Sequence, residues 1–138
     1  MQGKVFLDTN VFVYTQSKSE QKKRDIALNA IEKYDCCTST QVFNEASNVM
    51  INKLKMPIFE VKQVITAIND RCTVCIITHA TVQYALDLKE FYGYSFYDSL
   101  ILATAMLNDC DYVLSEDLHD GHIIGNKMKI VNIFKQNV

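Results

Sequence analysis

Four acidic residues occupy positions where burying a carboxylate costs free energy unless the carboxylate has a partner or takes part in a reaction. Asp8 and Asp117 each follow a short apolar run, whereas Glu45 and Asp98 lie in the first turns of apolar segments with helical spacing. Two carboxylates about 4 Å apart repel each other by about 4 kcal/mol at an effective dielectric constant of about 20, so a cluster of them must take up protons or a cation. Hard divalent ions such as Mg2+ and Mn2+ prefer oxygen ligands and can activate bound water. This set of residues therefore favours metal-assisted hydrolysis of a phosphodiester, with one or two ions.

The elements that would position these acids alternate along the chain. Short apolar runs predict strands at residues 5–7, from 36 onward, at 74–77, at 112–114 and at 130–134. Apolar residues at helical spacing predict helices over 20–34, 41–54, 57–70, 79–91 and 95–108, the last of them apolar nearly all round and so buried. Strands that alternate with helices indicate an α/β fold, in which a parallel sheet carries helices on both faces.

The order of these elements predicts where the acids meet. In an open α/β sheet, ligands bind outside the carboxyl ends of the strands. Asp8 and Asp117 stand at such ends, and Glu45 and Asp98 stand at helix starts that lie on the same side. We expect all four carboxylates to gather at one edge of the sheet.

Each acid also has an ordinary structural alternative. Asp98 suits a capping box with Ser95, and Glu45 suits a solvated helix edge. Asp8 could belong to a local turn, and Asp117 could be a simple loop acid. The joint placement argues against these alternatives, because a buried strand end and a buried helix start are poor places for unpaired carboxylates.

Composition bounds the class of protein. The 138 residues, 49% of them apolar and 22% charged, suit one globular domain over residues 1–138 and exclude a mainly disordered chain. Fourteen Lys and Arg against sixteen Asp and Glu exclude a strongly basic nucleic-acid binder. We expect neither a signal peptide nor a membrane span, since Asp8 interrupts the first apolar run and no later run is long enough. Five cysteines, an odd number, favour free thiols and a cytoplasmic protein.

Four segments carry a resemblance to a known family. Residues 6–10 (FLDTN), 43–45 (FNE), 95–105 (SFYDSLILATA) and 114–121 (LSEDLHDG) resemble the successive motifs of the PIN-domain nucleases, and especially the VapC-type toxins of bacterial toxin–antitoxin pairs. The resemblance covers about residues 5–134. It implies a three-layer α/β/α sandwich with a mostly parallel, Rossmann-like sheet, and an endoribonuclease that depends on Mg2+ or Mn2+.

The resemblance also implies a role for each motif residue. Asp8, Glu45 and Asp98 would be catalytic metal ligands, and Asp117 would fill the fourth acidic position directly or through water. Glu116 and Asp120 lie close enough in sequence to replace Asp117. Three polar residues would support the acids or the phosphate: Thr9, Asn10 and Ser115.

Partners follow from the same resemblance. It implies an RNA substrate, a homodimer, and a small antitoxin whose basic residues enter the acidic cleft. A free-standing PIN-domain nuclease in RNA processing is the alternative, and a non-catalytic, receiver-like acidic module is a weaker one. A phosphatase with an aspartate nucleophile is disfavoured because Asn10 stands where its second acid would be.

Other residues are weaker candidates for a catalytic, metal-binding or RNA-binding role. Cys72 and Cys75 have the CxxC spacing of zinc and redox sites, but a strand there would direct them to opposite faces, which favours structural thiols. His119 and His122 flank the loop beside Asp117, where they are either solvated or in contact with RNA or metal. A basic rim for RNA, or else merely solvated helix faces, is formed by Lys18, Lys22, Lys23, Arg24, Lys53 and Lys55.

Overall fold

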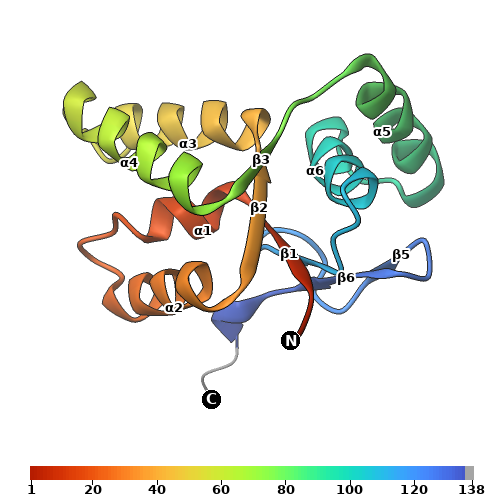
Figure 1. Cartoon of the computed structure of the whole chain (residues 1–138), viewed down its shortest axis with the longest axis horizontal. Helices are drawn as coiled ribbons and strands as arrows, with labels where there is room; N and C mark the ends of the chain where they lie inside the picture. Colours follow the sequence, from red (N-terminus) through yellow and green to blue (C-terminus); the bar gives the residue numbers. More distant parts are fainter. Residues whose placement is uncertain (136–138) are drawn as a thin grey trace.

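A computed structural model describes residues 1–135 as one six-stranded sheet with helices on both sides (Figure 1). The strands are β1 (Lys4–Leu7), β2 (Asp35–Ser39), β3 (Thr73–Cys75), β4 (Tyr112–Leu114), β5 (Ile123–Ile124) and β6 (Met128–Val131). The helices are α1 (Thr9–Tyr14), α2 (Gln21–Lys33), α3 (Thr40–Asn52), α4 (Ile58–Arg71), α5 (His79–Tyr92), α6 (Phe96–Leu107) and the 3-10 turn η1 (Ile133–Lys135). The predicted α/β architecture with a mostly parallel sheet is confirmed.

The order of the strands puts β1 and β4 side by side at the middle of the sheet. The order is β3-β2-β1-β4-β6-β5, and every pair is parallel except β5 with β6. The chain winds outward from β1 through β2 to β3, and later from β4 to β6. The boundary between β1 and β4 is therefore the topological switch point, where open α/β sheets form their binding crevice.

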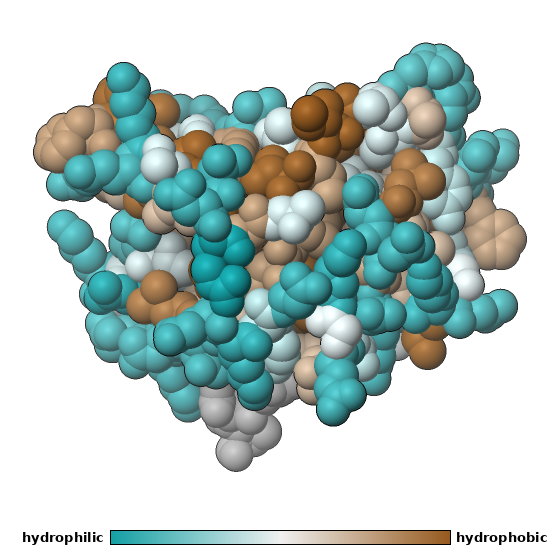
Figure 2. Space-filling model, in the orientation of Figure 1, coloured by the Kyte–Doolittle hydropathy of each residue, from teal (hydrophilic) through white to brown (hydrophobic). Residues whose placement is uncertain are grey.

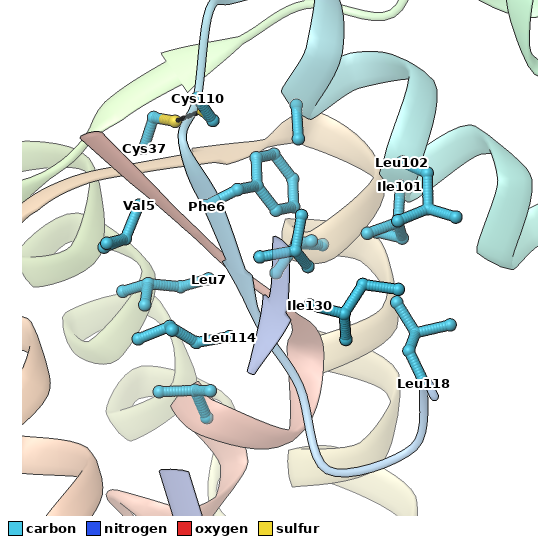
Figure 3. Close-up of a cluster of buried hydrophobic side chains, with 14 of the residues drawn as sticks. Val5, Phe6, Leu7, Cys37, Ile101, Leu102, Cys110, Leu114, Leu118 and Ile130 are labelled. Atoms are coloured by element: carbon cyan, nitrogen blue, oxygen red, sulfur yellow. Dashed lines mark hydrogen bonds between the residues drawn. The ribbon is translucent and has the colours of Figure 1, made fainter. Parts of the chain in front are cut away.

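Strand β1 is buried on both faces, as its unbroken apolar run predicts. Val5, Phe6 and Leu7 are all completely inaccessible. Figure 3 shows Val5 and Leu7 on one side of the sheet with Leu114, and Phe6 on the other side facing Leu102 of α6. The apolar side chains on both faces fix the position of the carboxyl end of β1, and with it the residue that follows.

Local sequence signals set the ends of the helices that flank the site. The Ser39 side chain accepts a hydrogen bond from Val42 N and caps α3, and Ser95 does the same for α6 through Asp98 N. Helix α5 ends at Gly93, whose φ of 82° is left-handed and suits glycine. In Figure 1, α1 to α4 lie on one side of the sheet, and α5 and α6 lie on the other.

Several sequence expectations were wrong in detail. The strand predicted over 130–134 ends at Val131, because the Asn132 side chain accepts a hydrogen bond from Phe134 N and the chain turns into η1. Strand β3 stops at Cys75, and Ile76, predicted inside it, is 74% exposed. The short elements α1 and β5 were not predicted. Across residues 1–135, no helix combines the length and apolarity needed to cross a membrane.

Candidate active site

Asp8 sits at the switch point between β1 and β4. Its backbone N–H donates to Leu114 O over 3.1 Å, which ties the end of β1 to β4. Its carboxylate accepts 2.7 Å hydrogen bonds from Thr9 N and from the Ser115 hydroxyl, and the residue caps α1. Asp8 is only 7% exposed. Two different chain segments therefore hold one buried carboxylate in a fixed orientation.

Burial and neighbouring acids act strongly on this carboxylate. Burial is the largest cause that raises the pKa of Asp8 to about 6, against the hydrogen bonds from Ser115 and Thr9, which lower it. The charges of Glu45 and Asp117 raise the pKa further. The Asp8 carboxylate is therefore close to other negative charges and shielded from water. This environment favours either protonation of the carboxylate or binding of a cation.

Glu45 is held by two side chains from different elements. Thr9 Oγ1 donates to its Oε1 over 2.7 Å, and Gln41 Nε2 donates to its Oε2 over 3.2 Å. Gln41 Nε2 also reaches Tyr97 O at 3.1 Å, which connects α3 to the start of α6. Gln41 was missed by the sequence analysis, although its i,i+4 spacing to Glu45 at the start of α3 was an available signal.

Asp98 both starts a helix and belongs to the acidic group. Its backbone N–H donates to Ser95 Oγ over 3.2 Å, which is one half of the capping box considered as the ordinary alternative. Burial raises the pKa of its carboxyl, the Ser95 hydroxyl opposes this, and the charges of Asp117 and Glu45 raise the pKa further. The two interpretations of Asp98 are compatible, because the Ser95 cap uses its backbone N–H while the charges of Asp117 and Glu45 act on its carboxyl.

Asp117 is connected to the site through Asn10. The Asn10 amide donates to Asp117 Oδ2 over 3.2 Å, while its Oδ1 accepts from Glu116 N at 3.2 Å. Asp117 N in turn donates to Ser115 Oγ over 3.2 Å. Asn10 and Ser115, two of the polar residues predicted to support the acids, thus connect the segment that carries Asp8 with the segment that carries Asp117.

The two acids that could have replaced Asp117 are engaged elsewhere. Glu116 receives hydrogen bonds of 2.5 Å from the Tyr14 hydroxyl and 2.6 Å from the Lys23 ammonium. Asp120 accepts from Asn132 N over 2.8 Å, at the start of the turn into η1. Asp117 is the one of the three whose carboxylate contacts Asn10 and whose charge acts on Asp8 and Asp98, so the geometry favours it over either neighbour.

The four acids have no positive partner in the part of the chain that the structure describes, where the ion pairs involve other carboxylates. Their oxygen donors suit Mg2+ or Mn2+ in chemical type. Among residues 1–135, no three Asp, Glu, His or Cys side chains lie close enough together to hold one ion. Mg2+ is usually bound by one or two carboxylates and several waters, so the donor set fits this mode and does not form an all-protein cage.

The remaining sequence candidates are distributed around the molecule. Lys18, Lys53 and Lys55 line one groove between the α1–α2 and α3–α4 connections, whereas Lys23 is paired with Glu116. All five cysteines are free and buried. Cys72 interacts with Cys36, and Cys75 interacts with Cys37, so the CxxC pair does not form one site.

Comparisons with known proteins agree with this fold. The family model of the PIN domain matches residues 5–119, and the chain therefore belongs to the PIN domain family. A search of curated protein sequences finds no match.

Solved structures similar to this chain include toxins and toxin–antitoxin complexes. A toxin–antitoxin complex from Klebsiella pneumoniae aligns with a TM-score of 0.68 at 17% identity, over 94% of this chain and 97% of that one. VapC20 of Mycobacterium tuberculosis, a toxin that cleaves the sarcin-ricin loop, aligns with a TM-score of 0.64 at 15% identity, over 82% and 91%. VapBC2 of Rickettsia felis, bound to a promoter DNA fragment, gives 0.60 at 18% identity, over 83% and 88%.

Proposed function

We propose that this chain is a metal-dependent endoribonuclease that hydrolyses RNA phosphodiester bonds and serves as the toxin of a toxin–antitoxin pair. The observation that carries the proposal is a group of four acids, without a positive partner among residues 1–135, at the switch point of a PIN-domain sheet. Negative charge concentrated in this way repels RNA unless a cation intervenes, so a nuclease built here needs a divalent ion.

Each site residue has a proposed role. Asp8, Glu45, Asp98 and Asp117 would hold Mg2+ or Mn2+, one or two of them as direct ligands and the others through bound water. When bound, the ion supplies an activated water and neutralises charge on the phosphate. The protein's own part is to hold the carboxylates in fixed orientations, which the donors on Thr9, Asn10, Gln41 and Ser115 support.

Two surfaces support the proposed partners. An apolar groove between α1, α2 and α4, lined by residues such as Phe12, Leu28 and Val64, offers a place for an apolar antitoxin segment. Arg or Lys from the same partner would pair with the four acids and displace the ion. Figure 2 shows apolar side chains over α3, α4 and the segment that leads to α5. Exposed apolar residues of these elements include Ile51 in α3, Ile58 in α4 and Ile76 between β3 and α5. This surface supports the proposal of a homodimer.

We also propose that the protein acts in the cytoplasm as one nuclease domain over residues 1–138. Five free, buried thiols support this location, because oxidising compartments favour disulfides. The RNA substrate would enter along the groove with Lys18, Lys53 and Lys55.

Purified protein and single-stranded RNA test the nuclease proposal. Cleavage should require Mg2+ or Mn2+ and stop with excess chelator. Asp8→Asn should keep the fold and lose cleavage, because an amide lacks the charge that holds the ion. Asp87→Asn, an exposed acid on α5, is the matched control and should cleave normally. Undiminished cleavage by Asp8→Asn, or by wild type in chelator, would rule out the mechanism.

Co-expression tests the toxin role separately. The product of an adjacent small gene should form a complex that has little RNase activity, and Mg2+ should partly restore that activity. A monomer that cleaves RNA, is harmless in cells and has no such neighbour would instead be a free-standing nuclease.

A further inference from the structure

Five aromatic rings form a continuous cluster beside the acidic site. We call Phe91, Tyr92, Tyr94, His119 and His122 the ring cluster. The His122 ring lies at its centre, with ring centroids 5.1 Å from Tyr92, 5.7 Å from Tyr94 and 5.6 Å from His119. Tyr92 continues the cluster to Phe91 at 4.7 Å. The end of α5 and the loop after β4 thus meet through their rings.

The ring cluster adjoins two of the proposed metal ligands. Tyr94 immediately precedes Ser95, the cap of the helix that carries Asp98, and His119 stands two residues after Asp117. The negative charge of Asp98 contributes to raising the pKa of Tyr94, after burial and against a backbone hydrogen bond from His119. The cluster therefore begins at the acidic edge and extends away from it towards Phe91.

Inner and outer members of the cluster differ in what they contact. Tyr94 Oη lies 2.7 Å from His122 Nδ1, and the Tyr92 hydroxyl accepts from Gly125 N at 2.8 Å, so these inner rings are fixed by hydrogen bonds. His119 is exposed and Phe91 is 80% exposed. Within residues 1–135, neither of these two side chains makes a hydrogen bond. A fixed inner layer thus presents two open rings to the solvent next to the acids.

We propose that the ring cluster is a stacking site for unpaired bases of the RNA strand whose phosphate lies at the acids, with His119 nearest the cut and Phe91 further out. Aromatic and imidazole rings stack on any base, and single-stranded nucleic acids are bound in this way. Aliphatic side chains would serve an apolar protein partner equally well, but here the exposed groups are planar rings at the edge of a phosphate site. The site would therefore select single-stranded RNA over a duplex, whose bases are already stacked.

This inference rests on the proposed function, but its test measures binding and not cleavage. The probes are two labelled eight-nucleotide strands, oligo(A) and a ribose-phosphate strand of the same length without bases. Fluorescence anisotropy is recorded in Ca2+, with gels confirming that the strands stay intact. Each variant is first compared with wild type by size-exclusion chromatography and thermal melting.

His119→Ala should weaken oligo(A) binding by about 5-fold to 100-fold, the range of one lost base stack. Binding of the strand without bases should not change, and His119→Phe should restore oligo(A) binding because a phenyl ring stacks without charge. Phe91→Ala should also weaken oligo(A) binding and leave binding of the strand without bases unchanged. The matched control is His79, an exposed histidine at the other end of α5, where alanine should have no effect.

Equal losses on both strands, no loss for His119→Ala, or failure of His119→Phe to rescue would overturn the stacking site. If the protein bound oligo(A) through these rings but never cleaved RNA, the proposed function would fail and the stacking site would stand. If the protein cleaved RNA but substitutions at His119 and Phe91 had no effect on oligo(A) binding, the stacking site would fail and the proposed function would stand.

Discussion

Ser115 Oγ donates a 2.7 Å hydrogen bond to Asp8 Oδ2 and so connects the ends of the neighbouring strands β4 and β1. The same oxygen accepts from Asp117 N at 3.2 Å and from Leu118 N at 3.3 Å. One buried hydroxyl therefore orients the central acid and shapes the loop that carries the fourth acid. Its loss should affect stability and chemistry together.

Ser115→Ala should lower the free energy of unfolding by about 1–3 kcal/mol, because two backbone N–H groups and a buried carboxylate lose their partner. The pKa of Asp8 should rise further, and RNA cleavage should fall by about 10-fold to 100-fold, as for other groups that orient metal ligands. Urea unfolding and initial cleavage rates measure the two effects. Ser99→Ala is the matched control, since the Ser99 hydroxyl is buried but makes no hydrogen bond. Equal effects of the two substitutions would contradict the role of Ser115.

The raised pKa of Asp8 predicts an unusual dependence of stability on pH. The carboxyl has a pKa of about 6 in the folded protein against 3.8 in the unfolded chain, so folding favours its protonated form. Its contribution is about 3 kcal/mol, fully present below pH 3.8 and lost as the pH rises through 6. The raised pKa of Asp98 acts in the same direction. Glu116 acts in the opposite direction, because its lowered pKa gives stability that is lost in acid.

Comparison of wild type with Asp8→Asn isolates the contribution of Asp8. In chelator, the free energy of unfolding of the variant should exceed that of wild type at pH 7, and this difference should shrink as the pH falls from 7 to 4. Adding Mg2+ should stabilise wild type at pH 7 and leave the variant almost unchanged, since only the ionised site binds the ion. A difference that stays constant with pH would contradict the burial of an uncompensated charge at Asp8.

Glu116 and Asp117 are adjacent, yet they should differ sharply in function. Burial alone would raise the pKa of Glu116, but hydrogen bonds from Lys23 and Tyr14 outweigh it and the pKa is lowered. Its charge is therefore already compensated. Glu116→Gln should lower cleavage much less than Asp117→Asn does, because Lys23 and Tyr14 already engage Glu116 away from the other acids. Asp117→Asn should lower cleavage by at least about tenfold. If the two variants exchanged these results, Glu116 would be the fourth acid.

Some of this site was predictable from the sequence because its causes are local. An apolar run buried on both faces ends at Asp8, and the rule for carboxyl ends of parallel strands brings Asp8 and Ser115 together without knowledge of side-chain contacts. The helix caps at Ser39 and Ser95 were predictable for the same reason, because each accepts a hydrogen bond from an N–H three residues later. These signals act over a few residues, and they position the backbone that carries the acids.

The parts that were not predictable depend on contacts distant in sequence. Lys23 pairs with Glu116 across 93 positions, and no pattern within either segment indicates it. Gln41 reaches Tyr97 O only after α3 and α6 have packed. The end of β6 was missed for a local reason instead: the Asn132 side chain accepts a hydrogen bond from Phe134 N, two residues later, in a run whose apolar character favoured a longer strand.

The buried cysteines give a final prediction. Cys37 Sγ and Cys110 Sγ lie 2.8 Å apart, and all five thiols are free and buried. Figure 3 shows the Cys37 and Cys110 side chains pointing toward each other in the core. The hydrogen bond with Cys110 is the largest cause that raises the pKa of the Cys37 thiol to about 12, so it stays protonated and unreactive at neutral pH. A thiol reagent such as dithionitrobenzoate should therefore react very slowly with the native protein and with five thiols after unfolding in guanidinium without reductant. Cys110→Ala should reduce the unfolded count to four and leave the native protein unreactive. Rapid reaction of the native protein would contradict the burial, and a count of three in unfolded wild type would mean that two of the cysteines are joined in a disulfide.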